Sequence, residues 1–70
     1  MNNINLFIKF LKEERKRQNL TQVQLAKKAN INEKYYGGIE RGESIPTLEK
    51  VIELCNALGV KIHLDKNNIN

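Results

Sequence analysis

The sequence predicts an all-α fold: a compact domain of four helices with a short β-strand at its C-terminal end. Apolar residues recur at three- and four-residue spacing in residues 6–18 and 47–58, the pattern of helices with one buried face. Between them, residues 21–42 carry start and stop signals for two shorter helices. A chain of 70 residues allows one domain. We expect it to divide into a helical core, a strand and a flexible tail, over residues 6–59, 60–65 and 66–70.

The first helix is expected to follow a frayed polar start. Phe7 and Leu11 lie four residues apart on one face, with Ile8 or Phe10 beside them. Arg15 continues the row of Phe7 and Leu11. Because a buried charge is costly unless it is paired, Arg15 needs an acidic partner elsewhere in the fold.

The second helix has a complete N-terminal signature. Thr21 with Gln24 three residues on makes a capping box, and Leu20 with Leu25 makes the accompanying hydrophobic staple. The helix should run over residues 22–29.

A third helix is expected after a turn of about three residues. Asn30 stands at the turn, and asparagine is one of the few non-glycine residues that tolerate the left-handed conformation needed there. Asn32 can cap the next helix, over residues 33–41, and Ile31 with Tyr36 repeats the staple. Two short helices joined in this way form a helix-turn-helix.

The fourth helix is predicted to begin at Pro46 and Thr47 and to end at Gly59. Five apolar residues at helical spacing predict its buried face: Leu48, Val51, Ile52, Cys55 and Leu58. On that face Cys55 is expected to be a small buried hydrophobe rather than a reactive thiol, since no basic residue flanks it.

Residues 60–65 alternate apolar and polar side chains, which predicts a strand. Its apolar side, Val60, Ile62 and Leu64, would cover the core. Because a lone strand has no partner within the chain, we expect it to pair with its copy across a two-fold axis. A dimer through a fifth helix is the alternative. His63 is expected to face solvent.

The net charge of +4 is concentrated in the first part of the chain. Residues 1–42 hold nine Lys and Arg against four acidic residues, whereas residues 43–59 hold one Lys against three Glu. This asymmetry suits a phosphate-binding face on the basic part. A merely solvated basic surface is the alternative interpretation.

Several functional classes are excluded by composition. No apolar run is long enough to span a bilayer and no secretory signal pattern is present, so a soluble cytoplasmic protein is expected. A single cysteine cannot form an internal disulfide, and no Cys/His cluster has metal-ligand spacing. No motif assembles a nucleophile, a base and an orienting group. We therefore expect neither an enzyme nor a bound metal or cofactor.

Four short motifs resemble those of the Cro and phage-repressor (XRE) family of bacterial regulators: T-Q-x-x-L-A, N-I-N, I-E-R-G and P-T-L. The resemblance covers residues 7–60. It implies a lambda-repressor-like DNA-binding domain with its helix-turn-helix at the second and third helices. It also implies an ion pair between Arg15 and Glu40 that is structural rather than a DNA contact.

In such a domain the third helix reads base edges in the major groove. The matching base-reading positions here are Asn32, Glu33, Lys34, Tyr35 and Gly38. Lys34 can donate to guanine, and Glu33 can accept from cytosine or stabilise the helix dipole. Tyr35 can lie on a thymine methyl or bond a phosphate. The expected phosphate contacts are Thr21, Gln22, Arg41 and Ser44, with a solvated role as the alternative for Gln22 and for the loop.

Residues 36–38 depart from the family pattern. Tyr36 replaces the usual aliphatic core residue, while Gly37 and Gly38 replace a small polar residue and a variable reader. Each glycine costs a helix ~1 kcal/mol relative to alanine, so a close approach to the second helix or to DNA would justify the pair. Specificity would then rest on fewer side chains, partly through DNA shape.

The resemblance implies a homodimeric, sequence-specific DNA-binding regulator, most simply a repressor that binds an inverted repeat of double-stranded DNA. An antitoxin with a toxin protein as its second partner, or a restriction-modification controller, is the alternative within that class. A protein-interaction module without DNA binding is the alternative of another class, because fold alone does not determine function.

Overall fold

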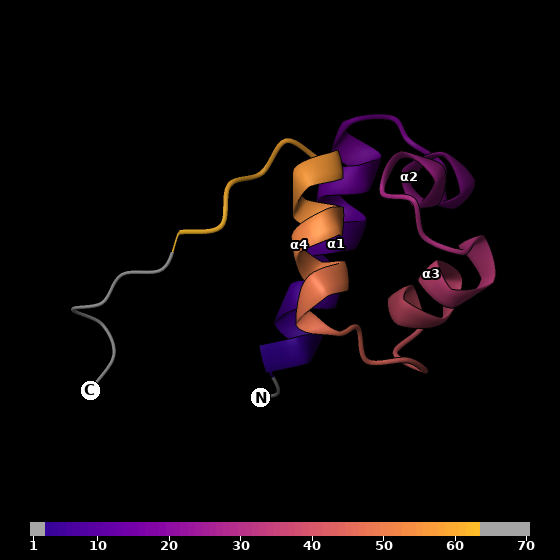
Figure 1. Cartoon of the computed structure of the whole chain (residues 1–70), viewed down its shortest axis with the longest axis vertical. Helices are drawn as coiled ribbons and strands as arrows, with labels where there is room; N and C mark the ends of the chain where they lie inside the picture. Colours follow the sequence, from indigo (N-terminus) through magenta and orange to yellow (C-terminus); the bar gives the residue numbers. More distant parts are fainter. Residues whose placement is uncertain (1–2, 64–70) are drawn as a thin grey trace.

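The computed structural model describes residues 3–63, which form four helices and no strand (Figure 1). The helices are α1 (Asn3–Arg17), α2 (Gln22–Lys28), α3 (Glu33–Glu40) and α4 (Leu48–Ala57). α2 packs against α3 and α4, and α3 also packs against α1. The all-α fold with a helix-turn-helix at α2 and α3 is therefore confirmed.

Both predicted N-caps of the helix-turn-helix are present. The Thr21 hydroxyl accepts the Gln24 N–H at 3.0 Å, and the Gln24 side chain accepts the Thr21 N–H at 2.8 Å. The Asn32 side-chain oxygen accepts the N–H groups of Lys34 and Tyr35 at 2.9 and 3.0 Å. These bonds satisfy backbone donors that the first turn of a helix leaves open.

All four helices of the described region end in the same way. Each is followed by a residue with φ between 58° and 79°: Asn19, Asn30, Gly42 and Gly59. The next amide then returns to the last turn, as the Ile31 N–H does to the Ala26 carbonyl at 2.8 Å. This closure satisfies open carbonyls at each helix end. Asn30 adopts the predicted left-handed turn, whereas the same turn at Asn19 was not predicted.

The core lies where the helices meet. Its largest fully buried side chains come from all four helices: Leu11, Leu25, Tyr36, Ile39 and Leu54. Ala26 is also fully buried in α2, where a small side chain allows α3 to approach closely. Cys55 is buried as predicted, and burial raises the pKa of its thiol, which disfavours the reactive thiolate.

Two helices begin at other residues than predicted. α1 begins at Asn3 rather than at residue 6, because Ile4 packs against the core and holds the first turn in place. α4 begins at Leu48 rather than at Pro46, because Thr47 is its N-cap. The Thr47 hydroxyl accepts the backbone N–H three residues on at 3.2 Å.

The buried face of α4 also differs from the predicted one. Leu54 is fully buried, whereas Leu48 and Ile52 are 74% and 42% exposed. The buried residues of α4 all lie in its second half, so the first turn projects beyond the helices that cover the core. Similarly, in α1 Ile8 is buried while Phe10 is exposed. Periodicity identifies an apolar face but not what covers it.

Residues 60–63 leave α4 as an irregular segment (Figure 1). The strand predicted over residues 60–65 is therefore absent from its described part; Leu64, Asp65 and the predicted tail lie outside the described residues. Val60 packs partly against the core. The hydrogen bonds of the predicted strand would come from a second copy, so one chain by itself cannot display them.

Candidate nucleic-acid interface

Glu40, the last residue of α3, is buried and accepts hydrogen bonds from three side chains. Arg15 donates from Nε and Nη2 at 2.7 and 3.1 Å, which is the ion pair that the family resemblance implied. Gln22 Nε2 donates at 2.9 Å, and the Tyr36 hydroxyl donates to Oε2. One carboxylate thus joins α1, the start of α2 and α3.

The bonds to Glu40 decide its ionisation. Burial alone would raise the pKa of Glu40, but the hydrogen bonds from Arg15, Tyr36 and Gln22 outweigh it and hold the pKa below its ordinary value. Burial, and then the bond to Glu40, raises the pKa of the Tyr36 phenol above its ordinary value. The network at neutral pH is therefore a carboxylate surrounded by donors.

The bonds from Tyr36 and Gln22 to Glu40 were not predicted from sequence. A signal for the first was present, since Tyr36 precedes Glu40 by four residues, the spacing at which side chains on a helix meet. Gln22 is distant in sequence, so no local pattern indicated its partner. In the structure, this predicted phosphate residue therefore also makes a hydrogen bond within the protein.

Gly37 and Gly38 form the meeting point of three predicted phosphate residues. A Cβ at Gly37 would lie 3.1 Å from Arg41 Nη1 and 3.6 Å from Gln22 Oε1. A Cβ at Gly38 would lie 3.1 Å from Ser44 Oγ. The glycine pair therefore makes room chiefly for side chains that follow α3, whereas the nearest atom of α2, in the Gln22 side chain, lies at an ordinary contact distance. Gly38 itself is buried, so its predicted base-reading position is covered in this structure.

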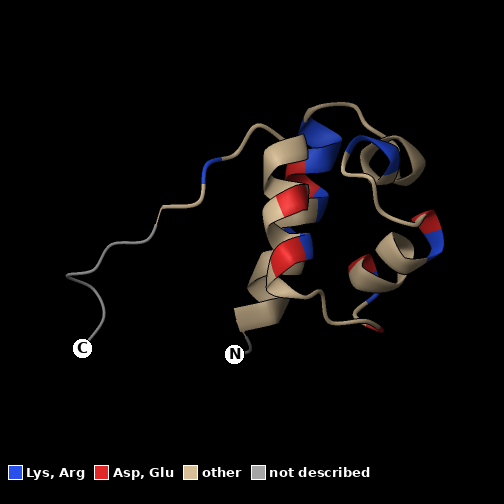
Figure 2. Cartoon of the chain, viewed as in Figure 1, with Lys and Arg blue, Asp and Glu red and all other residues tan. Residues whose placement is uncertain are grey.

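The other predicted base-reading residues lie at the N-terminal end of α3. Asn32, Glu33 and Lys34 are exposed, and Tyr35 is half-buried against the core. Figure 2 shows an acidic and a basic residue next to each other at this end of α3. The Asn32 oxygen is engaged in capping the helix, which leaves Glu33 and Lys34 as the projecting charged side chains of the first turn.

The loop after α3 is tied to the glycine pair. The N–H groups of Glu43 and Ser44 donate to the Gly38 carbonyl at 2.8 and 3.2 Å. Arg41 donates from Nε and Nη2 to the Glu43 carboxylate at 3.0 and 3.1 Å, and both side chains are more than half exposed. This loop therefore presents a paired arginine at the surface beside α3.

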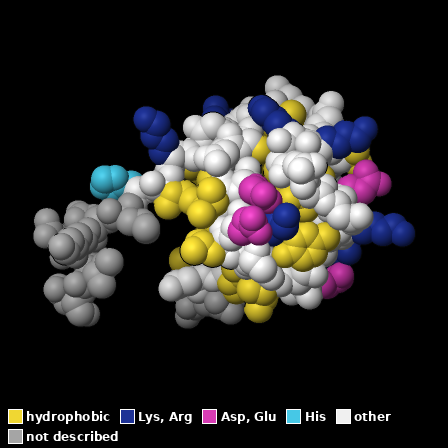
Figure 3. Space-filling model, viewed as in Figure 1, with side chains coloured by type: hydrophobic (Ala, Val, Ile, Leu, Met, Phe, Trp, Pro, Cys, Tyr) yellow, Lys and Arg dark blue, Asp and Glu magenta, His cyan; other side chains and the backbone are white. Residues whose placement is uncertain are grey.

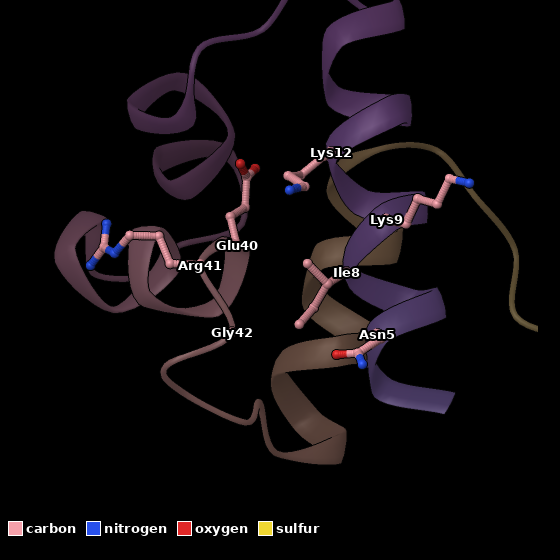
Figure 4. A pocket seen from close by; sticks show the side chains of 7 residues that line it. All are labelled: Asn5, Ile8, Lys9, Lys12, Glu40, Arg41 and Gly42. Carbon is pink, nitrogen blue, oxygen red and sulfur yellow. The ribbon is translucent and has the colours of Figure 1, made fainter. Parts of the chain in front are cut away.

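A shallow pocket of about 270 Å³ lies between α1 and the end of α3 (Figure 4). Lys9 and Lys12 of α1 line it together with Glu40. In Figure 4 the Arg41 side chain extends away from this pocket, across α3. Its guanidinium therefore belongs to the outer surface of α3.

Two further properties concern the described residues as a whole. Within residues 3–63 no group of three or more His, Cys, Asp or Glu side chains could hold a metal ion. In the same part of the chain, no helix has the length and apolar character needed to cross a membrane.

The fold and this surface define a class of protein: small domains with a helix-turn-helix whose second helix is exposed at its N-terminal end. Residues 11–64 match the family described as Helix-turn-helix. The chain belongs to this helix-turn-helix family, and its resemblance to the Cro and phage-repressor regulators is confirmed by the relatives that it matches.

Two curated relatives are phage repressors by name. Over 55 residues the chain is 44% identical to the immunity repressor protein of Bacillus phage phi105, covering 79% of this chain and 36% of the relative. Over 52 residues it is 36% identical to the cryptic phage CTXphi transcriptional repressor RstR of Vibrio cholerae serotype O1, covering 74% and 46%. The chain thus spans less than half the length of each relative. No solved structure matches it closely enough to count as a relative.

Proposed function

We propose that the chain is a sequence-specific DNA-binding transcriptional regulator, and that it represses by binding an inverted-repeat operator as a homodimer. One observation carries the proposal: Glu40 fastens the end of α3 to α1 and α2, while the opposite end of α3 projects exposed polar side chains. A helix held rigidly at one end and open at the other suits major-groove reading. The repressor names of the relatives support the same function.

The proposed DNA contacts divide by their chemistry. In the first turn of α3, Lys34 donates to guanine and Glu33 accepts from cytosine N4, with Asn32 and Tyr35 beside them. Phosphate contacts come from Thr21, Gln22, Arg41 and Ser44. The bond from Gln22 to Glu40 supports this arrangement, because it holds the Gln22 side chain next to the glycine face of α3.

The proposed homodimer uses an apolar groove beside α4. The groove has a volume of about 500 Å³ and is lined by Leu48, Ile52, Asn56, Lys61 and Ile62. Figure 3 shows hydrophobic side chains gathered where residues 60–63 leave α4. Because this segment forms one wall of the groove and has no strand partner among residues 3–63, the same segment of a second copy is the proposed occupant, in an isologous contact. Val60 and Ile62, the described apolar residues of this segment, would lie in the interface.

Selection of bound fragments from a random duplex DNA pool, at physiological salt, tests the proposed function. We expect an inverted repeat whose half-sites are about one helical turn apart. On that operator, Lys34→Ala should lose about 1 to 3 kcal/mol of binding free energy, with relaxed preference at one base pair. If Lys34→Ala loses the same affinity for every DNA sequence, Lys34 contacts a phosphate rather than a base. A pool without any enriched motif would contradict the proposal, and a co-purifying toxin protein would favour the antitoxin interpretation.

A further inference from the structure

The side of α3 that faces away from the core is nearly bare of side chains of its own, and its two glycines are buried beneath neighbouring side chains. At 3.6 residues per turn, four residues share this side: Lys34, Gly37, Gly38 and Arg41. The opposite side carries the buried Tyr36, Ile39 and Glu40. Beyond the first turn, Arg41 is therefore the one long side chain that the outer face of α3 carries within the described residues.

Arg41 occupies the space that the glycines leave. Its Nη1 lies 3.1 Å from the position of a Cβ on Gly37, and its Nη2 lies 4.0 Å from that of Gly38. The guanidinium thus folds back along the helix from its C-terminal end, as Figure 4 shows from the side of the pocket. A side chain at Gly37 would compete for the same position.

Glu43 determines which donors Arg41 presents. The two bonds to Glu43 use N–H groups of Nε and Nη2, which form one edge of the guanidinium fork. The remaining N–H groups are on Nη1 and Nη2, at the end of the fork. Two parallel donors at that end match the O6 and N7 acceptors of guanine.

The charge of Glu43 argues against a phosphate as the partner of Arg41. An arginine in a bidentate ion pair with a glutamate has almost no net charge with which to attract a phosphate, and the adjacent carboxylate repels an anion. Directional hydrogen bonds to a neutral base edge do not suffer from this repulsion. The pair therefore suits a base better than it suits the DNA backbone.

We propose that Arg41 is a base-reading residue, oriented by Glu43 over the Gly37–Gly38 face, and that it donates end-on to the O6 and N7 atoms of a guanine. It supplies the specificity that the glycines remove. This role rests on the proposed function, and it replaces the phosphate contact assigned to Arg41 above.

The test compares wild type, Arg41→Ala and Arg41→Lys on the selected operator, on its single-base-pair variants and on duplexes with 7-deazaguanine at each guanine. At one guanine, replacement by 7-deazaguanine should weaken the binding of the wild type roughly 5- to 150-fold and the binding of Arg41→Ala less than about 2-fold. Arg41→Lys should fall between them, because lysine can also donate to guanine. Lys34→Ala is the matched control, and its relaxed preference should fall at a different base pair. If Arg41→Ala retains the wild-type dependence on that guanine, another residue reads the base, Arg41 contacts a phosphate at most, and the inference is overturned.

Gly37→Ala provides a second test that does not depend on loss of a charge. Alanine favours the helix, so the melting temperature should stay or rise, while the added Cβ displaces the guanidinium and reduces discrimination at the same guanine. Unchanged discrimination with this variant would contradict the role of the bare face. If wild type selects no operator at all, the proposed function fails; if it selects one that Arg41→Ala reads identically, this inference alone fails.

Discussion

Among single residues, Glu40 shows how one buried carboxylate connects three helices. Arg15→Ala should remove two of its hydrogen bonds and lower the free energy of unfolding by about 3 kcal/mol, because a buried charge loses its partner. The Arg15 and Glu40 side chains are 11% and 3% exposed. Thermal unfolding measures the change, and sequence preference should remain that of the wild type.

Arg17→Ala is the matched control for Arg15→Ala. Arg17 also pairs with a glutamate, Glu14, but its own side chain is mostly exposed, so its removal should leave the melting temperature nearly unchanged. An Arg15→Ala protein of normal melting temperature with altered sequence preference would reverse the assignment and make Arg15 a DNA contact.

The Glu40 network also predicts how stability depends on pH. The pKa of Glu40 is lowered in the folded chain from its ordinary 4.5, so its contribution to stability is complete above that value and is lost as pH falls through the folded pKa. Tyr36→Phe removes one donor to the carboxylate. It should cost about 2 kcal/mol at neutral pH and move this acid loss of stability to higher pH.

Urea unfolding of wild type and Tyr36→Phe, at a series of pH values from 7 downward, measures both effects. The two chains have nearly the same core volume, because phenylalanine lacks only the hydroxyl. A Tyr36→Phe variant with the wild-type pH dependence would show that the phenol does not contribute to the ionisation of Glu40.

Among the helices, the caps allow the structural and DNA roles of Thr21 to be separated. Thr21 and Thr47 each accept a backbone N–H at the start of a helix, so each alanine variant should lower stability by about 1 kcal/mol. Thr21 is also a proposed phosphate contact, whereas Thr47 is the N-cap of α4. Operator affinity should fall further for Thr21→Ala than for Thr47→Ala. If the two variants are equally stable and bind the operator with equal affinity, Thr21 acts only as a helix cap.

How well each element was predicted depends on how local its determinants are. Thr21, Asn30 and Asn32 carry cap and turn signals within three residues, and the structure contains each of them. The partner of Arg15 came from family resemblance, since Glu40 lies 25 residues away in sequence. The buried hydroxyl of Tyr36 and the covering of Gly38 by Ser44 depend on packing between elements, which no local pattern contains.

In the whole molecule, three errors of prediction lie on one surface. Leu48 and Ile52 were assigned to the core by their spacing, and Ile62 to a strand by alternation; in the described chain all three are exposed beside one groove. A pattern of apolar residues is the same whether another helix or another molecule covers it. The sequence thus indicated an apolar face correctly, but the spacing of its apolar residues does not say whether the same chain or a second molecule covers it.

The groove predicts which substitutions separate the proposed dimer from the fold. Ile52→Lys and Ile62→Lys should each weaken self-association at least about 100-fold, because a lysine ammonium would be buried against the partner's apolar surface, while the exposed positions keep the monomer folded. Ile45→Lys is the matched control: Ile45 is 77% exposed but does not line the groove, and it should associate as the wild type does. Sedimentation equilibrium measures the association.

On operator DNA, the two groove variants should bind a single half-site as well as wild type and lose affinity for the full repeat. Groove variants that associate like wild type, or a stable dimer after truncation at Gly59, would move the interface to another surface.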